Sequence, residues 1–224
     1  MKKTILPAIP AVLFFLVAAA LGIAKRSSYT DISAQSGYIG QLQVAQIPDE
    51  IAVEACKKLE RALPGCPVVL RVKAAGEMEY LFGDGRQKVC IEKVYKGDGL
   101  ETGQEIYIYA NGWRLSLHGD PDSVECNFVN IMKPDAEYLV FISCQTSSLD
   151  EALPSYQLYD EQIIAPVFCY EKRTNKIMPM KGEGTYVPYV DVRQNEFFAA
   201  GKKGLAAWEL LKSKMLSLYM KTSG

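Results

Sequence analysis

The sequence contains a single histidine and none of the common catalytic strings. Its 224 residues hold no GxSxG, HExxH or GxxxxGK(S/T) pattern and no CxxC pair. These absences argue against nucleophile-elbow hydrolases, zinc peptidases, P-loop nucleotide hydrolases, zinc ribbons and thioredoxin-like proteins. One histidine also excludes any metal site built from several histidines. No motif therefore assigns a reaction or a cofactor, and no internal repeat is visible.

The sequence also lacks an excess of either charge. Lysine and arginine number 25 against 26 aspartates and glutamates, which gives a formal net charge of −1. Such a balance provides no field that would hold a polyanion, so we do not expect a nucleic acid as partner. Hydrophobic residues make up 49% and charged residues 23%, which is ordinary globular usage and indicates neither a disordered chain nor a polytopic membrane protein.

A long uncharged run near the start of the chain indicates a membrane segment. It begins at Ile5 and ends at Ala24, and a helix over it, at about 1.5 Å per residue, would span the roughly 30 Å hydrocarbon core. We therefore expect residues 1–26 to be a signal anchor, leaving a single-pass protein in the cell membrane with its C-terminal domain outside. The alternative is a protein secreted after signal cleavage beside Gly22 or Ala24.

Behind this segment, residues 27–47 are polar and contain glycine, and we expect them to form a spacer. Residues 48–224 should form the globular domain. Apolar residues at helical spacing predict a helix over 49–63, capped by Asp49, and a second helix over 205–220. Lysines flank the apolar stripe of the second helix, which either packs against the domain or lies on an anionic membrane surface. They are Lys202, Lys203, Lys212, Lys214 and Lys221.

Between the two helices the apolar residues recur with a period of two, which predicts strands. Strands are expected over 68–82, 88–95, 105–109, 138–142, 156–159 and 163–170. A hairpin turn is expected at Gly83, and the third strand should end at Gly112, before a long loop over 113–130. The fold class is therefore mainly β with flanking helices, an α+β arrangement.

Two stretches of the sequence carry a resemblance to a known family. They read VCIEKVYKGDGLETGQEIYIY from Val89 and EYLVFIS from Glu137. They resemble the bacterial members of the netrin and tissue-inhibitor-of-metalloproteinase-like domains, which are small β-barrels of the oligonucleotide/oligosaccharide-binding (OB) fold. The resemblance implies a small OB-like β-barrel over about residues 68–158, behind one N-terminal transmembrane helix. It implies a scaffold and carries no catalytic residue.

The animal inhibitors of this family chelate the metal of their target with a free N-terminal cysteine. Here the first cysteine, Cys56, falls inside a predicted helix, behind a hydrophobic N-terminal segment. The resemblance therefore does not imply inhibition of metalloproteinases. A protease-inhibitor-like protein stays an alternative to the main hypothesis.

Six cysteines form an even set: Cys56, Cys66, Cys90, Cys126, Cys144 and Cys169. In an exported domain they permit three disulfides, whereas in a reducing compartment they would be buried thiols. We expect at least one disulfide, and Cys56 with Cys66 is the nearest pair in sequence. The alternative for this pair is two packed thiols.

The stretch that contains His118, Asp120, Asp122 and Cys126 is the one place where chemical groups gather in sequence. Cys126 and His118 could form the nucleophile and base of a hydrolase. The two aspartates could offer oxygens to calcium, but the stretch lacks the acidic spacing of a dedicated calcium loop. The glycines in 97–103 lie between strands and not before a helix, so they do not form a phosphate loop.

Tyrosines are abundant, and on one face of a barrel they could stack on sugars or grip a peptide. They are Tyr80, Tyr95, Tyr107, Tyr109, Tyr138, Tyr156, Tyr159, Tyr186 and Tyr189. The sequence favours a non-catalytic binding module at the cell envelope, with no cofactor. Its expected partners are the membrane, through residues 5–24, and an envelope or extracellular protein or glycan. The rival hypothesis is an exported hydrolase that uses Cys126 and His118.

Overall fold

The computed structural model describes residues 12, 14–19, 21–22, 37–81, 83–117, 119–147, 153–179 and 185–221. The chain divides into two units, residues 1–36 and residues 37–224. In the first unit, residues 14–19 and 21–22 are helical. None of the described helices is both long enough and apolar enough to cross a membrane. Most of the expected membrane segment, residues 5–24, lies outside the described residues.

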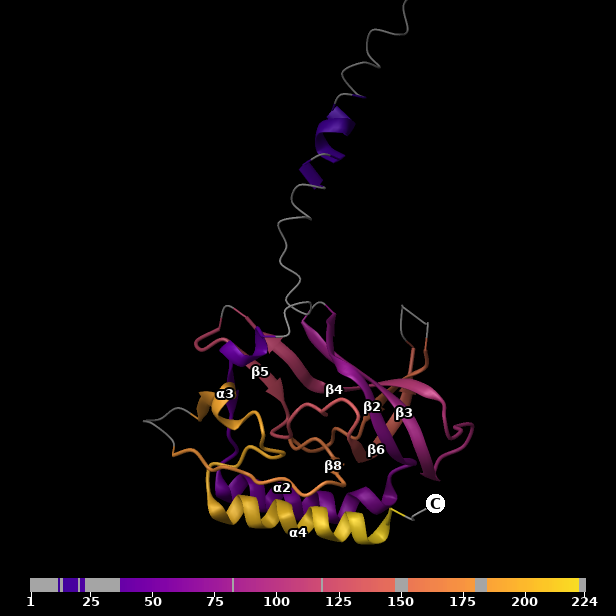
Figure 1. The fold of residues 1–224 in the computed structure, drawn as a ribbon, viewed down its shortest axis with the longest axis vertical. Coiled ribbons are helices and arrows are strands. Elements are labelled where there is room, and N and C mark those ends of the chain that lie inside the picture. The colour runs from indigo at the N-terminus through magenta and orange to yellow at the C-terminus, as the bar shows by residue number, and fades with distance from the viewer. Residues whose placement is uncertain are drawn as a thin grey trace, which may run out of the picture. The chain divides into compact units, whose positions relative to one another are not determined.

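The described part of the second unit is mainly β and holds nine strands in one sheet, with helices on its flank (Figure 1). The strands are β1 Gln43–Ala45, β2 Val68–Leu81, β3 Asp84–Lys96, β4 Glu105–Ser116, β5 Ser123–Cys126, β6 Glu137–Thr146, β7 Ser155–Leu158, β8 Val167–Cys169 and β9 Tyr186–Pro188. They are ordered β3-β2-β6-β7-β4-β5-β1-β9, and β8 pairs with β6. β3 also pairs with β4, so the pairings from β3 through β2, β6, β7 and β4 return to β3. The expected mainly β fold with flanking helices is confirmed.

The hairpin of β2 and β3 is the best-predicted part of the sheet. The two strands pair antiparallel from Val69 opposite Lys96 to Leu81 opposite Asp84. Gly83 turns the chain between them with a φ of 97°, a left-handed conformation that favours glycine. Buried and half-exposed residues alternate along β3, as the period of two predicts for a strand with one face in the core.

β4 differs from the expectation, because it continues past Gly112 to Ser116. The expected loop over 113–130 holds both the end of β4 and the whole of β5, which pair antiparallel with Trp113 opposite Cys126. β4 continues because Gly112 has a different role from the one that the sequence indicates. A Cβ atom there would collide with the side chain of Asn127, so this glycine permits a close approach and does not mark a turn.

The expected spacer also differs from the structure. Residues 37–47 contain a 3-10 turn, Ile39–Gln41, and strand β1, and the side chains of Leu42, Val44 and Ile47 are buried. β1 pairs antiparallel with β9, which is the outer strand of the sheet and ends in Pro188. The short helix α3, Tyr189–Val192, follows. Residues 27–36 of the expected spacer lie outside the described residues.

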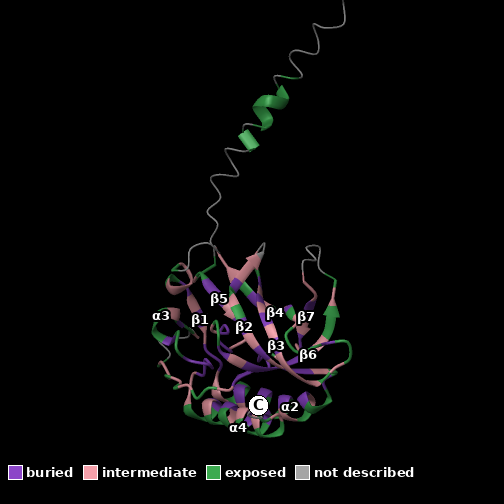
Figure 2. Cartoon of the chain, turned by 45° about the vertical axis from the view of Figure 1, so that its right-hand side comes forward, coloured by how far each residue is buried: buried purple, intermediate pink, exposed green. Residues whose placement is uncertain are grey.

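Helices α2, Asp49–Ala62, and α4, Lys202–Leu218, lie side by side on one flank of the strands (Figure 1). A 3-10 turn, Leu63–Gly65, ends α2, so the predicted extent of this helix is confirmed. In Figure 2 the outer sides of both helices are exposed and the sides toward the strands are buried. The helices therefore form a second layer that covers the core from one side.

Asp49 does not cap its own helix. The N-cap of α2 is Pro48, and no side chain caps it. The Oδ1 atom of Asp49 instead accepts a hydrogen bond of 2.7 Å from the backbone N–H of Gly204, in the first turn of α4. The aspartate therefore ties the start of one helix to the start of the other.

α4 packs on the domain through both its apolar and its charged residues. Trp208 stacks between Phe168 and Phe197, with ring centroids 4.9 Å and 4.6 Å apart. Three of the five lysines of the predicted helix pair with carboxylates of the same unit: Lys212 with Glu196, Lys214 with Glu60 and Lys221 with Glu137. Of the two alternatives for this helix, packing against the domain is the one that these contacts support.

Candidate functional site

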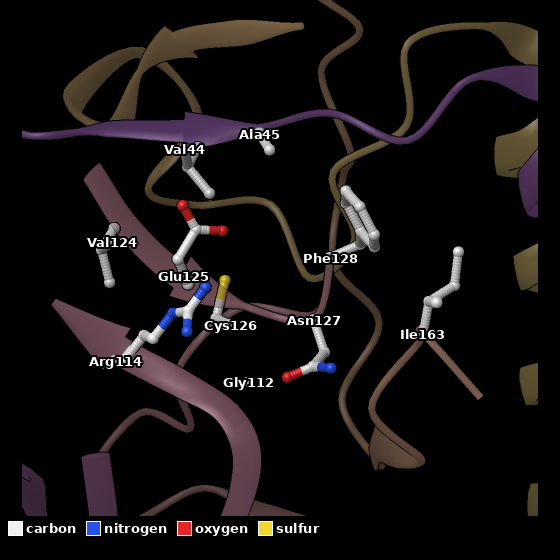
Figure 3. A pocket seen from close by; sticks show the side chains of 10 residues that line it. All are labelled: Val44, Ala45, Gly112, Arg114, Val124, Glu125, Cys126, Asn127, Phe128 and Ile163. Atoms are coloured by element: carbon white, nitrogen blue, oxygen red, sulfur yellow. The ribbon is translucent and has the colours of Figure 1, made fainter. Parts of the chain in front are cut away.

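A pocket of about 240 Å³ opens between strands β1, β4 and β5 (Figure 3). Its walls come from these strands, from the two residues that follow β5 and from the chain ahead of β8. The lining residues are Val44, Ala45, Gly112, Arg114, Val124, Glu125, Cys126, Asn127, Phe128 and Ile163.

The pocket holds one cation and one carboxylate on neighbouring strands. Arg114 of β4 and Glu125 of β5 are register partners in the antiparallel pair, and they lie side by side in Figure 3. The Oε1 atom of Glu125 accepts hydrogen bonds from the hydroxyls of Ser123, at 2.7 Å, and Tyr186, at 3.2 Å. Arg114 is exposed and forms no ion pair with any described residue. Its donors are therefore open to a ligand.

The rest of the pocket is largely apolar. Val44 and Val124 are buried, Phe128 is half-buried, and Ile163 is 46% exposed at the rim. Small-molecule and peptide sites combine such apolar walls with a few polar groups that fix orientation. This pocket also combines apolar walls with a few polar groups, in a small volume.

The turn after β5 shapes one wall of the pocket. Asn127 and Phe128 both have positive φ angles, 52° and 61°, in the left-handed region that non-glycine residues seldom adopt. This turn lays the side chain of Asn127 over Gly112, and the Oδ1 atom of Asn127 is buried without a hydrogen-bond partner among the described residues. Backbone strain of this kind gathers at functional sites.

Cys126 lies in this pocket but is poorly suited to act as a nucleophile. It is buried, and burial raises the pKa of its thiol, with a further increase from the nearby charge of Glu125. A thiol held in its protonated form is a weak nucleophile. His118, the base in the rival hydrolase hypothesis, lies outside the described residues. Of this pair the structure therefore places only the cysteine, in surroundings that suppress its reactivity.

The two aspartates that could have offered oxygens to calcium do not belong to a metal site in the described structure. Asp120 and Asp122 are both exposed, and no group of three or more potential metal-ligating side chains occurs among the described residues. The glycines at 97, 99 and 103 have positive φ angles of 131°, 73° and 85°, so they serve the turns between β3 and β4.

All six cysteines are free thiols in the structure, and the expected disulfide between Cys56 and Cys66 is not formed. Cys56 belongs to the buried face of α2, while Cys66 follows the 3-10 turn. Burial raises the pKa of Cys56 to about 12 and that of Cys66 to about 11. The two packed thiols that were the alternative for this pair are what the structure contains. Cys126 and Cys169 are also buried, Cys90 is half-buried and Cys144 is exposed.

The tyrosines serve mainly to hold the domain together. The hydroxyl of Tyr95 donates to the carbonyl oxygen of Met220 at 2.8 Å, and that of Tyr107 donates to Glu79 at 3.2 Å. The guanidinium carbon of Arg86 lies 3.9 Å from the centroid of the Tyr107 ring. One face of this ring is therefore already covered. Rings that could have stacked on sugars are thus partly covered by contacts within the protein.

The sequence did not single out Arg114, Glu125, Asn127 or Phe128. The signal that could have found them is the alternation along 111–116 and 123–126, which would have extended β4 and revealed β5. No family model matches this chain, and no curated protein matches it.

Proposed function

We propose that this protein is a non-catalytic binding module at the cell envelope, anchored by its N-terminal segment or secreted after cleavage, and that the pocket between β1, β4 and β5 receives its ligand. The observation that carries the proposal is the exposed guanidinium of Arg114 beside the half-buried carboxylate of Glu125, over apolar walls. Such a pocket offers recognition without a reactive group.

The two charged groups indicate the chemistry of the ligand. Arg114 only donates hydrogen bonds, and Glu125 as a carboxylate only accepts them. Their charges cancel, which disfavours a strongly charged ligand. A peptide group or a pair of sugar hydroxyls supplies an acceptor and a donor together. A segment of an envelope or extracellular protein, or a glycan, is the partner that fits.

The rival hydrolase has less support. A nucleophile is activated by a base within hydrogen-bond reach, by a lowered pKa, or by both. Burial raises the pKa of Cys126, and the lowering effect of the backbone hydrogen bond of Phe128 is smaller than that of burial. The pocket therefore supports binding better than covalent catalysis.

The strand pairings support a small barrel of OB type as the scaffold of this module. β2, β3, β4, β6 and β7 form the circuit that returns to β3, and together they occupy residues 68–158, the range of the proposed barrel. β4 and β7 pair parallel, with Tyr107 opposite Ser155, and the other pairs of the circuit are antiparallel. This topology is compatible with the resemblance to the netrin-like domains, which belongs to the proposal.

The experiment compares three variants of the full chain, purified in detergent, on arrays of peptides and of envelope glycans. Arg114→Gln and Glu125→Gln should each weaken binding by about tenfold, because each removes a charge-assisted hydrogen bond. Arg61→Gln is the matched control, since Arg61 is an exposed arginine on α2. Binding that survives both pocket variants, or that Arg61→Gln weakens equally, would exclude this pocket. A domain resistant to protease on intact cells but cleaved after lysis would exclude the envelope location.

A further inference from the structure

A second pocket, of about 440 Å³, lies between α4 and the segment that follows β8. It shares no lining residue with the first pocket. Its walls are rich in charge of both signs, and they include Lys172, Arg173 and Lys212 as well as Glu171, Glu196 and Glu209. The two sites are therefore separate, and the second can bind a ligand whatever the function of the first.

One pair of charges in this pocket is neutralised within the protein. The side chain of Glu196 is 4% exposed, and its carboxylate forms an ion pair with Lys212. Its other oxygen accepts the backbone N–H of Cys169 at 2.8 Å. Lys212 also donates to the carbonyl oxygen of Glu171 at 3.2 Å. The ion pair of Glu196 and Lys212 connects α4 to the start of the segment at β8, and its two charges cancel.

Arg173 has no such partner. Its guanidinium is half-buried and donates to the hydroxyl of Tyr138 at 2.6 Å, and it lies 5.5 Å from the centroid of the Tyr138 ring. No carboxylate of the described residues forms an ion pair with it. Glu196 acts on it only from a longer distance. A neutral phenol is therefore its one hydrogen-bonded partner among the described side chains.

One further cation, Lys133, lies within electrostatic range of Arg173. Burial lowers the pKa of Lys133, and the charge of Arg173 lowers it further; Cys169 and Glu171 oppose this by smaller amounts. The ammonium of Lys133 bonds to a neutral amide oxygen, that of Gln194. Arg173, in the wall of the pocket, and Lys133 thus interact as two cations, and neither forms an ion pair with a carboxylate of the described residues.

A half-buried cation without a carboxylate partner is costly, and proteins normally pair such a charge. The planar guanidinium of arginine presents two parallel donors that match a carboxylate or a phosphate. We propose that this pocket is a second binding site, which takes the oxyanion of a small molecule, a carboxylate or a phosphate, on the fork of Arg173. Lys172 also lines the pocket, and Lys133 adds a charge within electrostatic range of Arg173.

The test is calorimetric titration of the full chain, in detergent and at constant ionic strength, with inorganic phosphate in one arm and citrate in the other. The intact protein should bind at least one of the two saturably, and the tighter arm identifies the source of the oxyanion. Arg173→Gln should weaken this binding by about tenfold or more, because it removes the charged fork. Arg173→Lys keeps the charge and loses the fork. Its affinity should lie between that of the intact protein and that of Arg173→Gln.

Arg61→Gln, which makes the same change of charge on the exposed face of α2, should leave the binding unchanged. Lys133→Gln should weaken the binding by a smaller factor than Arg173→Gln. Because Arg173 remains in place in Lys133→Gln, this variant keeps the test decisive if Arg173→Gln does not fold. Titrations without saturation in both arms would overturn the proposal. An equal loss in Arg61→Gln would also overturn it, because only net charge would then matter.

Discussion

Replacing Asp49 by alanine is expected to destabilise the start of α4, although Asp49 belongs to α2. The first four N–H groups of a helix have no partner within it, and the N-cap of α4, Gly201, has no side chain to supply one. The carboxylate of Asp49 fills this role for Gly204. Loss of a capping side chain costs about 1 kcal/mol, and loss of a negative charge at a helix N-terminus adds roughly 0.3–1 kcal/mol. Asp49→Ala should therefore lower the free energy of unfolding by about 1–2 kcal/mol.

The measurement is urea unfolding of the full chain in detergent, followed by tryptophan fluorescence, together with hydrogen exchange of the Gly204 amide. Asp49→Asn keeps an acceptor and loses the charge, so its effect should be about half as large. Glu50→Ala is the control, because Glu50 is an exposed acidic residue in the same turn of α2 and makes no hydrogen bond to α4. Equal destabilisation by Asp49→Ala and Glu50→Ala, with unchanged exchange at Gly204, would refute the reasoning.

The close approach of Asp49 to Gly204 also predicts the effect of replacing Gly204 by alanine, and this effect is opposite to the one that helix propensity predicts. Alanine is normally the better helix former by about 1 kcal/mol. A Cβ atom at Gly204 would lie 2.9 Å from the Cβ of Ala52 and 3.0 Å from Oδ1 of Asp49, closer than such atoms approach. Gly204→Ala should therefore destabilise the protein in the same unfolding assay, and a stabilised variant would show that the two helices can move apart freely.

Two further predictions concern a buried glutamine and the order in which two cysteines react. Gln87 is buried and its amide donates to the carbonyl oxygens of Gly76 and Met132, at 2.9 Å and 2.7 Å, so Gln87→Leu should cost about 2 kcal/mol in urea unfolding; an unchanged midpoint would contradict this. Cys144 is exposed, whereas burial raises the pKa of Cys56 to about 12, so below pH 9 Cys144 should react first with a thiol reagent and Cys56 only on unfolding. Mass analysis of the labelled, unreduced protein follows this order, and a Cys144→Ser variant that still labels rapidly would contradict it.

The long elements of the fold could be predicted from the sequence because each contains its own signal. The alternation from Val68 onward and the glycine at 83 define the β2–β3 hairpin, and the spacing of apolar residues defines α2 and α4. β1, β5 and β9 have three or four residues each, too few for a period of two to stand out. Their existence depends on pairing with strands far away in sequence.

The candidate site could not be predicted for the same reason. Arg114 faces Glu125 only because β4 continues past Gly112 and pairs with β5. Asn-Gly is a strong turn signal, and here it misled, because the glycine makes room for the side chain of Asn127. The sequence placed Cys126 beside possible catalytic groups, but only the strand pairing reveals that its thiol is buried.

The outer strand β9 limits how the sheet can grow. The hydrogen bonds from Gln46 N–H to the carbonyl of Thr185 and from Tyr189 N–H to the carbonyl of Leu42 join this segment to β1, so the backbones of Tyr186 and Pro188 face outward. Proline has no N–H, which leaves Tyr186 as the residue of β9 with a donor for an incoming strand. An edge with so few donors resists strand addition. A second copy of the domain is thus not expected to extend this sheet by adding a strand at β9.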